Sequence, residues 1–394
     1  MRDFSWIVPT RFVFGKDAEK EVGQWASSMN YKKVLVVYGG GHVVKSGLLK
    51  KVLYAIETSG IAHIEMGGVR PNPEITVVRQ GVELARSNNV DLIIAVGGGS
   101  VIDCSKAIAI GAKLTCDVWN VFDPSKHMQF SNALPIAVIL TIPASGSESS
   151  DSCVISNDEV GLKSAITSDL IRAQVAFMDP VLTMSLPSWQ TFSGITDICA
   201  HIMERYFSCS EDVISTDSIA LALLRSVRSE ALKLIRDPTD YDARANIMWL
   251  GTLAHNGLAG IGREEDWGSH ALEHELSAVK PTVTHGAGLA VIFPAWMRYV
   301  CDANPRRFID FGRGVFGFVP TGDDLADASS VIDIVQKFFI SLGMPQYLDE
   351  FGFVHTDIDK FIIGLHENQG KSFGSFKILN MEDARMIYKS AFKS

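Results

Sequence analysis

The sequence lacks the features of a disulfide-stabilised or membrane-spanning protein. Its six cysteines form no Cys-x-x-Cys pair and no regular framework, and a chain of 394 residues needs no disulfides to bury a sufficient core. Residues 1–6 contain no apolar signal-peptide core, and the most apolar later run, 287–296, is too short to cross a bilayer and contains Pro294. These absences predict a soluble protein of the reducing cytoplasm.

The sequence also lacks a surplus of basic residues. It has 36 lysines and arginines against 45 aspartates and glutamates, which gives a formal net charge of −9. Nucleic acids and anionic membranes are bound through basic surfaces, so we expect neither as the main partner. Nucleotide phosphates can still bind locally, because helix N-termini and backbone N–H groups supply a positive potential.

Two sequence patterns divide the chain near residue 185. Before it, short runs rich in Val, Ile and Leu alternate with helix-length segments such as 75–87, a pattern typical of buried parallel strands with crossover helices. The strand-like runs lie at 33–38, 61–66, 91–96, 135–140 and 174–178. After it, helical periodicity dominates, as at 214–234, 241–258, 331–342 and 381–392. We predict a doubly wound α/β domain at 1–185 and an all-α domain at 186–394.

Two further β features are expected in the first domain. Residues 6–8 and 11–14 flank a break at Pro9 and are candidates for two strands at the edge of the sheet. Residues 152–165 have β-type side chains on either side of polar turn residues, which predicts a hairpin.

A glycine run, Gly97-Gly98-Gly99, stands between a predicted strand and a predicted helix. Because glycine has no side chain, a pyrophosphate can approach the backbone N–H groups at such a helix N-terminus. A run of three glycines alone is usually only a loop, and this one is not the Gly-x-Gly-x-x-Gly fingerprint. Its position after a strand nevertheless favours a nucleotide site, which would include Ser100.

Candidate metal ligands stand in the second half of the chain. Asp197 and His201 are four residues apart, so their side chains share one face of a helix. His270 and His274 repeat this spacing, and His285 follows. Three imidazoles and a carboxylate suit Fe²⁺ or Zn²⁺ better than the hard cations Ca²⁺ and Mg²⁺. One helical histidine is more often structural, but several together favour a metal site.

With these motifs, residues from about 4 to about 392 resemble the iron-dependent, or group III metal-containing, alcohol dehydrogenases, most closely their NADPH-dependent butanol dehydrogenase branch. The resemblance implies a dehydroquinate synthase-like architecture with a dinucleotide-binding N-terminal domain, and a homodimer in which the N-terminal strands take part. It implies one divalent metal, Fe²⁺ first and Zn²⁺ second, and leaves His274 beside the nicotinamide as the residue that transfers a proton. The implied metal ligands are Asp197, His201, His270 and His285.

The resemblance also implies a set of cofactor-binding residues. Gly97, Gly98, Gly99 and Ser100 would bind the pyrophosphate, Asp103 would act near the nicotinamide end, Thr141 and Ser145 would line the cofactor cleft, and Lys163 would lie near the ribose.

A second glycine run bears on the choice of cofactor. Gly39, Gly40 and Gly41 end the first predicted strand, where a ribose normally lies. NAD-preferring relatives carry an acidic residue at the position of Gly39, which would repel the 2′-phosphate of NADP. We therefore predict NADP(H), with His42 or Lys45 as phosphate partners. A tight turn that requires positive φ is the alternative explanation of these glycines.

The predicted reaction is hydride transfer between NADP(H) and a small alcohol or aldehyde, such as butanol or butanal. A bound cation would stabilise the alkoxide, and the few cationic groups near the metal motifs favour an uncharged aliphatic substrate. Asn256, Asp266 and Trp267 are candidates for the border of the substrate pocket, with ordinary core packing as the alternative for Trp267.

Three alternatives remain open. A glycerol-type dehydrogenase or a dehydroquinate synthase would keep the fold and change the reaction. The segment His270-Ala-Leu-Glu273-His274 also matches the His-x-x-Glu-His motif of inverzincin peptidases, in which Glu273 would activate water. That alternative leaves Asp197, His201 and both glycine runs unexplained. A non-catalytic metal-binding or nucleotide-binding protein is the third.

Overall fold

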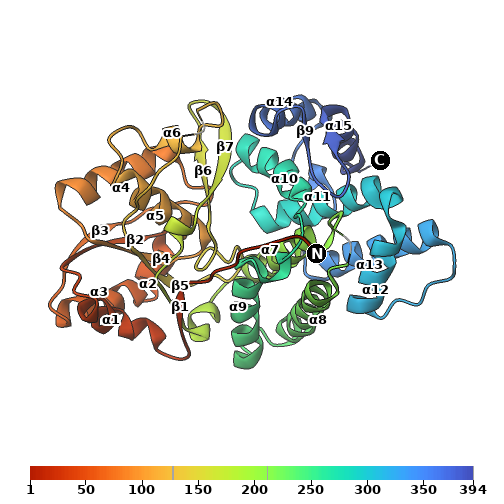
Figure 1. Ribbon diagram of the computed structural model, residues 1–394. Coiled ribbons are helices and arrows are strands. Elements are labelled where there is room, and N and C mark those ends of the chain that lie inside the picture. Colours follow the sequence, from red (N-terminus) through yellow and green to blue (C-terminus); the bar gives the residue numbers. More distant parts are fainter. Residues whose placement is uncertain (127, 211, 394) are drawn as a thin grey trace. The chain divides into compact units, whose positions relative to one another are not determined.

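The computed structural model describes residues 1–126, 128–210 and 212–393. The chain forms two compact units (Figure 1): an N-terminal unit of residues 7–185, and a helical unit of residues 186–394 that also includes residues 1–6. No helix of the described residues is both long and apolar enough for a transmembrane span.

The N-terminal unit is built on one parallel sheet. Its strand order is β1-β8-β5-β4-β2-β3, with register pairs such as Val34↔Leu92 and Ile93↔Ile136. The strands are β1 (Arg11–Phe14), β2 (Lys33–Tyr38), β3 (Ala62–Met66), β4 (Leu92–Gly97), β5 (Ile136–Leu140) and β8 (Val175–Met178). After the edge strand β1, the chain enters the sheet at β2, adds β3 on one side, and then adds β4, β5 and β8 on the other. This reversal of direction confirms the doubly wound α/β fold.

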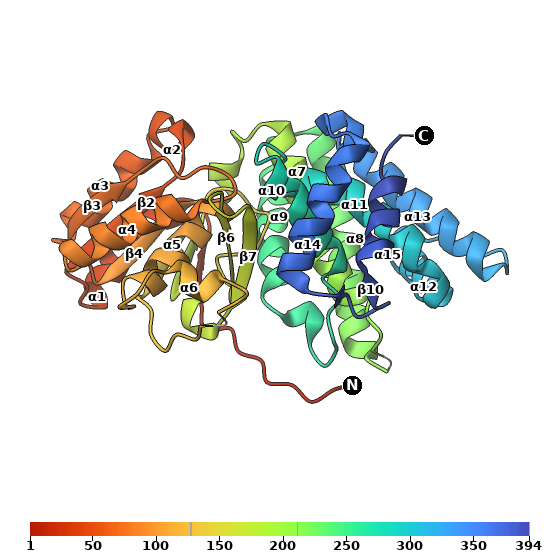
Figure 2. The same ribbon diagram turned by 90° about the horizontal axis from the view of Figure 1, so that it is seen from above.

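Helices cover both faces of this sheet, as Figure 1 shows from the side and Figure 2 from above, which explains why its central strands are continuously apolar. On one face α1 (Val22–Ser28) packs with α3 (Leu48–Thr58), and on the other α4 (Ile75–Ser87) packs with α5 (Gly99–Gly111). The short helices α2 (Gly41–Lys45) and α6 (Trp119–Phe122) also belong to this unit. Alternate strand residues, including Val34, Val36 and Ile94, form one buried cluster with Val52 of α3, as the period of two requires.

The predicted hairpin is present, but only one of the two N-terminal strands forms. Strands β6 (Ser152–Asn157) and β7 (Leu162–Thr167) pair antiparallel. β1 pairs in parallel with β8, as an edge strand. The strand expected at 6–8 is wrong: the Trp6 indole N–H instead donates to the Asn256 carbonyl at 3.0 Å, which ties the first residues to the helical unit.

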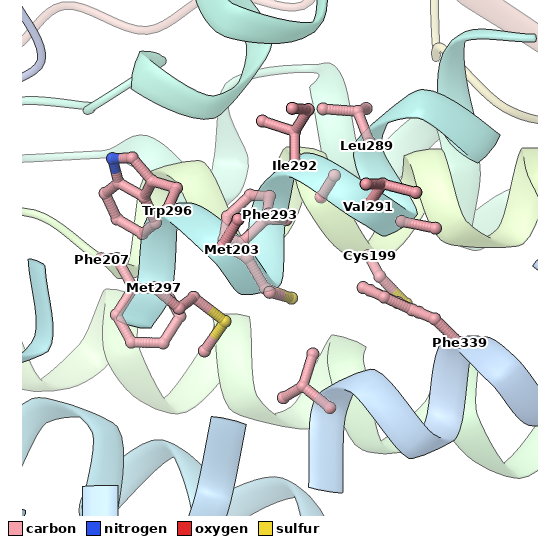
Figure 3. Packing of buried hydrophobic residues seen from close by; sticks show 14 of the residues in the cluster. Cys199, Met203, Phe207, Leu289, Val291, Ile292, Phe293, Trp296, Met297 and Phe339 are labelled. Carbon is pink, nitrogen blue, oxygen red and sulfur yellow. The ribbon is translucent and has the colours of Figure 1, made fainter. Parts of the chain in front are cut away.

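The helical unit surrounds a nearly fully buried helix, α11 (His285–Val300). Figure 3 shows its core: Phe293 of α11 lies beside Met203 of α7 (Ser188–Tyr206), and Trp296 of α11 lies against Phe207. The other helices are α8 (Ile214–Arg236), α9 (Tyr241–His255), α10 (Gly268–Val279), α12 (Pro305–Phe316), α13 (Asp324–Ser341), α14 (Ile358–Gln369) and α15 (Met381–Ser390). A minimal antiparallel pair, β9 (Ser372–Phe373) and β10 (Leu379–Asn380), accompanies them. α11 packs against both α7 and α10, which brings together the candidate metal ligands on these three helices.

Candidate metal centre and nucleotide-binding loops

The structure brings all four predicted metal ligands together in the helical unit. Asp197 and His201 of α7 and His270 of α10 offer one oxygen and two nitrogens, all within 4.8 Å of one another. His285, the first residue of α11, places Nε2 3.7 Å from Asp197 Oδ1. The spacing of four on α7 holds Asp197 Oδ1 3.5 Å from His201 Nδ1. Three imidazoles and one carboxylate form a donor set that fits Fe²⁺ or Zn²⁺.

A buried glutamate orients the ring of His270. Glu204 Oε1 accepts from His270 Nδ1 at 2.8 Å, from the His270 backbone N–H at 2.9 Å and from Ser269 Oγ at 2.6 Å. Because a carboxylate only accepts, the proton of His270 resides on Nδ1 and Nε2 keeps its lone pair. His270 Nε2 is buried and has no hydrogen-bond partner among the described residues. An orphaned buried acceptor costs about 1–3 kcal/mol, which a cation bound at Nε2 would remove.

The surroundings of His201 also keep its ring ready for a metal. Burial lowers the pKa of His201 well below its usual range, and the neighbouring His255 and His270 lower this pKa further. His201 is therefore neutral near pH 7, and a neutral imidazole is the form that coordinates metal ions.

A second buried glutamate supports His285. His285 Nδ1 donates to Glu273 Oε2, and Ser277 Oγ donates to Glu273 Oε1 at 3.2 Å. This contact places the proton of His285 on Nδ1 and leaves Nε2 facing Asp197. Glu273 is fully buried by these contacts, so it is not exposed to activate water as an inverzincin peptidase would require.

His274 lies one turn beyond His270 and apart from the ligand group that contains Asp197. Its ring is half-buried, with its centroid 5.4 Å from that of His285 and 6.5 Å from that of His270. This placement at the rim of the ligand set is compatible with a proton-transferring residue.

Two aromatic side chains beside the ligands distinguish this site. His255 is the last residue of α9. Its ring centroid lies 4.1 Å from that of His201 and 5.5 Å from that of Trp267. The ring centroid of Trp267 lies 5.0 Å from that of His270, and Trp267 adopts a left-handed backbone with φ of 62°. Such strain in a bulky residue is held by its surroundings and is common at functional sites. Trp267 therefore belongs to the site rather than to the apolar core. Sequence reasoning missed His255, which stands in no ligand-like spacing, and Glu204, whose partner His270 lies 66 residues further along the chain.

Asp266 and Asn256, by contrast, make structural contacts. Asp266 accepts backbone N–H groups from Gly268, Ser375 and Phe376, and burial raises the pKa of its carboxyl to about 7. Asn256 Oδ1 accepts from the backbone N–H of Leu258 at 3.0 Å. These contacts fix the segment before α10 and the turn between β9 and β10, and they support no substrate contact.

Substitution of Glu204 by glutamine tests the support of His270. The neutral amide binds Nδ1–H less strongly, so we expect the metal dissociation constant to rise by about 10–100-fold. Competition with a chromogenic chelator measures this constant. Glu367→Gln, an exposed change on α14, is the matched control and is expected to leave the constant unchanged. Equal constants for Glu204→Gln and the unchanged protein would contradict the assignment.

The first candidate nucleotide-binding loop joins two of the predicted motifs in the N-terminal unit. Gly97 ends β4 and α5 begins at Gly99. A Cβ atom would lie 2.3 Å from Ser145 Oγ at Gly99 and 2.5 Å from Val101 Cγ2 at Gly97. Both positions therefore require glycine for packing as well as for any phosphate. The Thr141 backbone N–H donates to the Gly97 carbonyl at 3.0 Å, which ties the loop after β5 to this turn.

Asp103 acts within the fold of this unit. Its half-buried carboxylate accepts from Ser147 Oγ at 2.5 Å and from the Val154 backbone N–H at 3.0 Å. Burial raises the pKa of this carboxyl. Both oxygens hold the loop after β5 and the hairpin, which is the geometry of a positioning residue. Lys163 is also buried, and its Nζ donates to Asn72 Oδ1 at 3.0 Å.

The backbone of the second glycine run excludes a tight turn with positive φ as the explanation of its glycines. None of Gly39, Gly40 and Gly41 has a positive φ, so a tight turn does not account for them. A Cβ atom at Gly39 would make only ordinary contacts, at 3.4 Å or more. His42 and Lys45 of α2 are both exposed, and His42 Nε2 lies 3.1 Å from Ser185 Oγ. The loop therefore has room for a side chain but presents no carboxylate.

Comparisons with known proteins identify the family of the chain. The family model "Iron-containing alcohol dehydrogenase" matches residues 9–180, and the model "Fe-containing alcohol dehydrogenase family, C-terminal" matches residues 191–392. The chain is 39% identical to NADH-dependent butanol dehydrogenase A of Clostridium acetobutylicum, with 100% of both chains covered. It is 33% identical to the NADPH-dependent aldehyde reductase YqhD of Escherichia coli, covering 99% of this chain and 100% of that one.

A solved structure gives the same result. The crystal structure of NADH-dependent butanol dehydrogenase A from Thermotoga maritima superposes with a TM-score of 0.95 at 37% identity and covers 100% of this chain and 99% of that chain. Two family models that together span nearly the whole chain, and relatives above 30% identity over their full length, are decisive. The protein belongs to the iron-containing alcohol dehydrogenase family and is an alcohol/aldehyde oxidoreductase.

Proposed function

We propose that the protein transfers a hydride between NADP(H) and a small uncharged primary alcohol or aldehyde of the butanol/butanal type, with one divalent metal, Fe²⁺ first and Zn²⁺ second. The observation that carries the proposal is the convergence of Asp197, His201, His270 and His285. The named butanol dehydrogenase and aldehyde reductase relatives support the substrate class.

The roles of the side chains follow from their contacts. Asp197, His201, His270 and His285 would hold the cation, which when bound supplies Lewis acidity that lowers the pKa of an alcohol hydroxyl. Glu204 and Glu273 keep two imidazoles in the tautomer that coordinates. His274 exchanges the proton with solvent, and the Trp267 ring shields the ligands from water.

Direct turnover tests this function. Metal-stripped protein is reconstituted with Fe²⁺ or Zn²⁺ and mixed with NADPH and butanal, and nicotinamide absorbance is followed. Glycerol and 1,3-propanediol, assayed with NADP⁺, distinguish a glycerol-type dehydrogenase, and a peptidase would show no nicotinamide oxidation. Absence of turnover with every aldehyde and alcohol in the panel would refute the proposal.

The cofactor preference is proposed from Gly39. The relatives named above include both NADH-dependent and NADPH-dependent enzymes, so the preference depends on the loop of this chain. Without a carboxylate at residue 39, the 2′-phosphate meets no local negative charge, and the exposed Lys45 lies nearby on α2. We infer that NADP(H) has the higher kcat/KM.

A carboxylate introduced at this position is expected to reverse the preference. Gly39→Asp fits sterically and should lower kcat/KM for NADPH at least about tenfold, equivalent to about 1.4 kcal/mol, while kcat/KM for NADH changes little. Steady-state kinetics with both cofactors measures the ratio. Gly39→Asn, of similar size but uncharged, controls for volume. A loss that is equal for both cofactors or for both variants would contradict the electrostatic explanation.

A homodimer and a reducing compartment are the remaining proposals. β1 is an edge strand, and Phe4 and Ile7 before it are exposed apolar residues, which supports an association through the N-terminal segment. Light scattering of the purified protein tests this. All six cysteines are free thiols, as a reducing cytoplasm would keep them.

A further inference from the structure

Three carboxylates gather at one edge of the N-terminal unit, away in sequence from every residue assigned above. Asp17 lies after β1, directly before the short helix 18–21, and Glu19 lies inside that helix. Asp179 directly follows β8. Because β1 and β8 are parallel neighbours, their carboxyl ends meet. One oxygen from each carboxylate lies within 4.8 Å of the other two.

Glu19 is the unusual member of this cluster. Its side chain is 1% exposed, and neither carboxylate oxygen has a hydrogen-bond partner among the described residues. It forms no ion pair in the described part of the chain, whereas Asp17 pairs with Lys20 at 2.7 Å. Burial raises the pKa of Glu19, and the neighbouring Asp179 carboxylate raises this pKa further. A buried carboxylate without a partner is costly, and buried charges are normally paired or coordinate a metal.

Asp179 is held rigidly for such a role. Its Oδ1 accepts from the Val181 backbone N–H at 2.8 Å, and its Oδ2 accepts from the Asp17 backbone N–H at 3.0 Å. The second bond fixes the loop that carries Asp17, whose backbone is left-handed with φ of 65°. The carboxylates of Asp17 and Glu19 are therefore presented to Asp179 by a fixed loop rather than by mobile side chains alone.

We propose that Asp17, Glu19 and Asp179 bind a hard divalent cation, Ca²⁺, at a site that shares no residue with the histidine-rich centre. An all-oxygen set selects hard cations, the opposite of the imidazole set in the helical unit. Ca²⁺ tolerates an irregular shell of oxygens at about 2.3–2.6 Å, whereas Mg²⁺ demands a near-ideal octahedron at about 2.0–2.1 Å and usually keeps several waters. Three protein carboxylates from separate segments therefore favour Ca²⁺. The cation neutralises Glu19 and joins the carboxyl ends of β1 and β8.

Calorimetry on the full-length protein tests the site. The protein is stripped with a chelator, its histidine centre is loaded with Zn²⁺, and CaCl₂ is titrated in. We expect one Ca²⁺ per chain, a Tm that rises with Ca²⁺, and a Ca²⁺ dissociation constant at least about tenfold weaker in Glu19→Gln, a loss of about 1.4 kcal/mol. Glu21→Gln, an exposed change in the same short helix, is the matched control and should bind Ca²⁺ normally.

Two further variants keep the test decisive. Asp17→Asn retains a residue type that tolerates the left-handed backbone, so it should fold and still weaken Ca²⁺ even if Glu19→Gln does not fold. His270→Ala should lose Zn²⁺ and keep Ca²⁺, which separates this site from the proposed catalytic metal. Absence of Ca²⁺ binding in the Zn²⁺-loaded protein would overturn the proposal. Undiminished binding in both Asp17→Asn and Glu19→Gln would overturn it as well.

Discussion

Replacing His201 with alanine is expected to lower kcat for aldehyde reduction by about 1,000-fold or more, because the Lewis acidity of a bound cation contributes several kcal/mol to catalysis. His201 is buried, neutral and surrounded by Asp197, His270 and His285. The alanine side chain supplies no donor atom in place of the imidazole nitrogen. The variant should therefore lose metal as well as activity.

Metal content and turnover are both needed to interpret this variant. Atomic emission on the purified protein should find close to one Fe²⁺ or Zn²⁺ per chain in the unchanged protein and a small fraction of that in His201→Ala. His366→Ala, an exposed histidine on α14, is the matched control and should change neither quantity. A variant that keeps its metal and its kcat would refute the ligand assignment, and a Tm close to that of the stripped protein shows that folding is retained.

The β-rich half of the fold is readable from the sequence because its signal is local. The apolar runs at 33–38 and 91–96 form β2 and β4 almost residue for residue. Burial on both faces leaves no polar residue inside these strands to confuse the pattern. The strand predicted at residues 6–8 is wrong because a distant contact decides their conformation. Trp6 suits a strand, but its indole N–H donates to the carbonyl of Asn256, 250 residues away.

In the candidate metal centre, too, local spacing reveals some residues, whereas others come together only in the folded chain. Asp197 and His201 are visible in the sequence since a spacing of four already places both side chains on one helix face. Glu204 contacts His270 only in the folded protein, because the two residues lie 66 positions apart on different helices. The sequence therefore does not show that Glu204 supports this ring. His255 reaches His201 from the end of α9 with no spacing that marks it. The acidic cluster that contains Glu19 depends on the pairing of the first and last strands of the sheet.

The second large effect is expected at an ion-pair network that supports α7. Asp217 of α8 accepts from Arg263 Nη2 at 2.6 Å and from Arg307 Nη1 and Nη2, both at 2.6 Å. Arg263 Nη1 donates to the Arg205 carbonyl at 2.8 Å, and Arg307 Nη2 donates to the Tyr206 carbonyl at 2.6 Å. The carboxylate thus holds two arginines that bind the last carbonyls of the helix carrying Asp197 and His201, although it lies outside the candidate metal site.

Asp217→Asn should lower the free energy of unfolding by about 3–5 kcal/mol, because it leaves the fully buried Arg263 side chain without its counter-charge. Burial alone would raise the pKa of Asp217, but Arg307 and Arg263 lower this pKa below its usual value. A lowered folded-state pKa gives stability that is present above the unfolded pKa, about 3.9, and is lost as pH falls through the folded value. The loss of unfolding free energy in the variant should therefore be full at pH 7 and smaller at acid pH.

Urea unfolding at pH 7 and at acid pH measures this loss. Asp333→Asn, which breaks the exposed ion pair with Arg298, is the control and should lower the free energy of unfolding by at most about 1 kcal/mol. Equal deficits for the two variants at pH 7 would show that the buried arginine does not need Asp217.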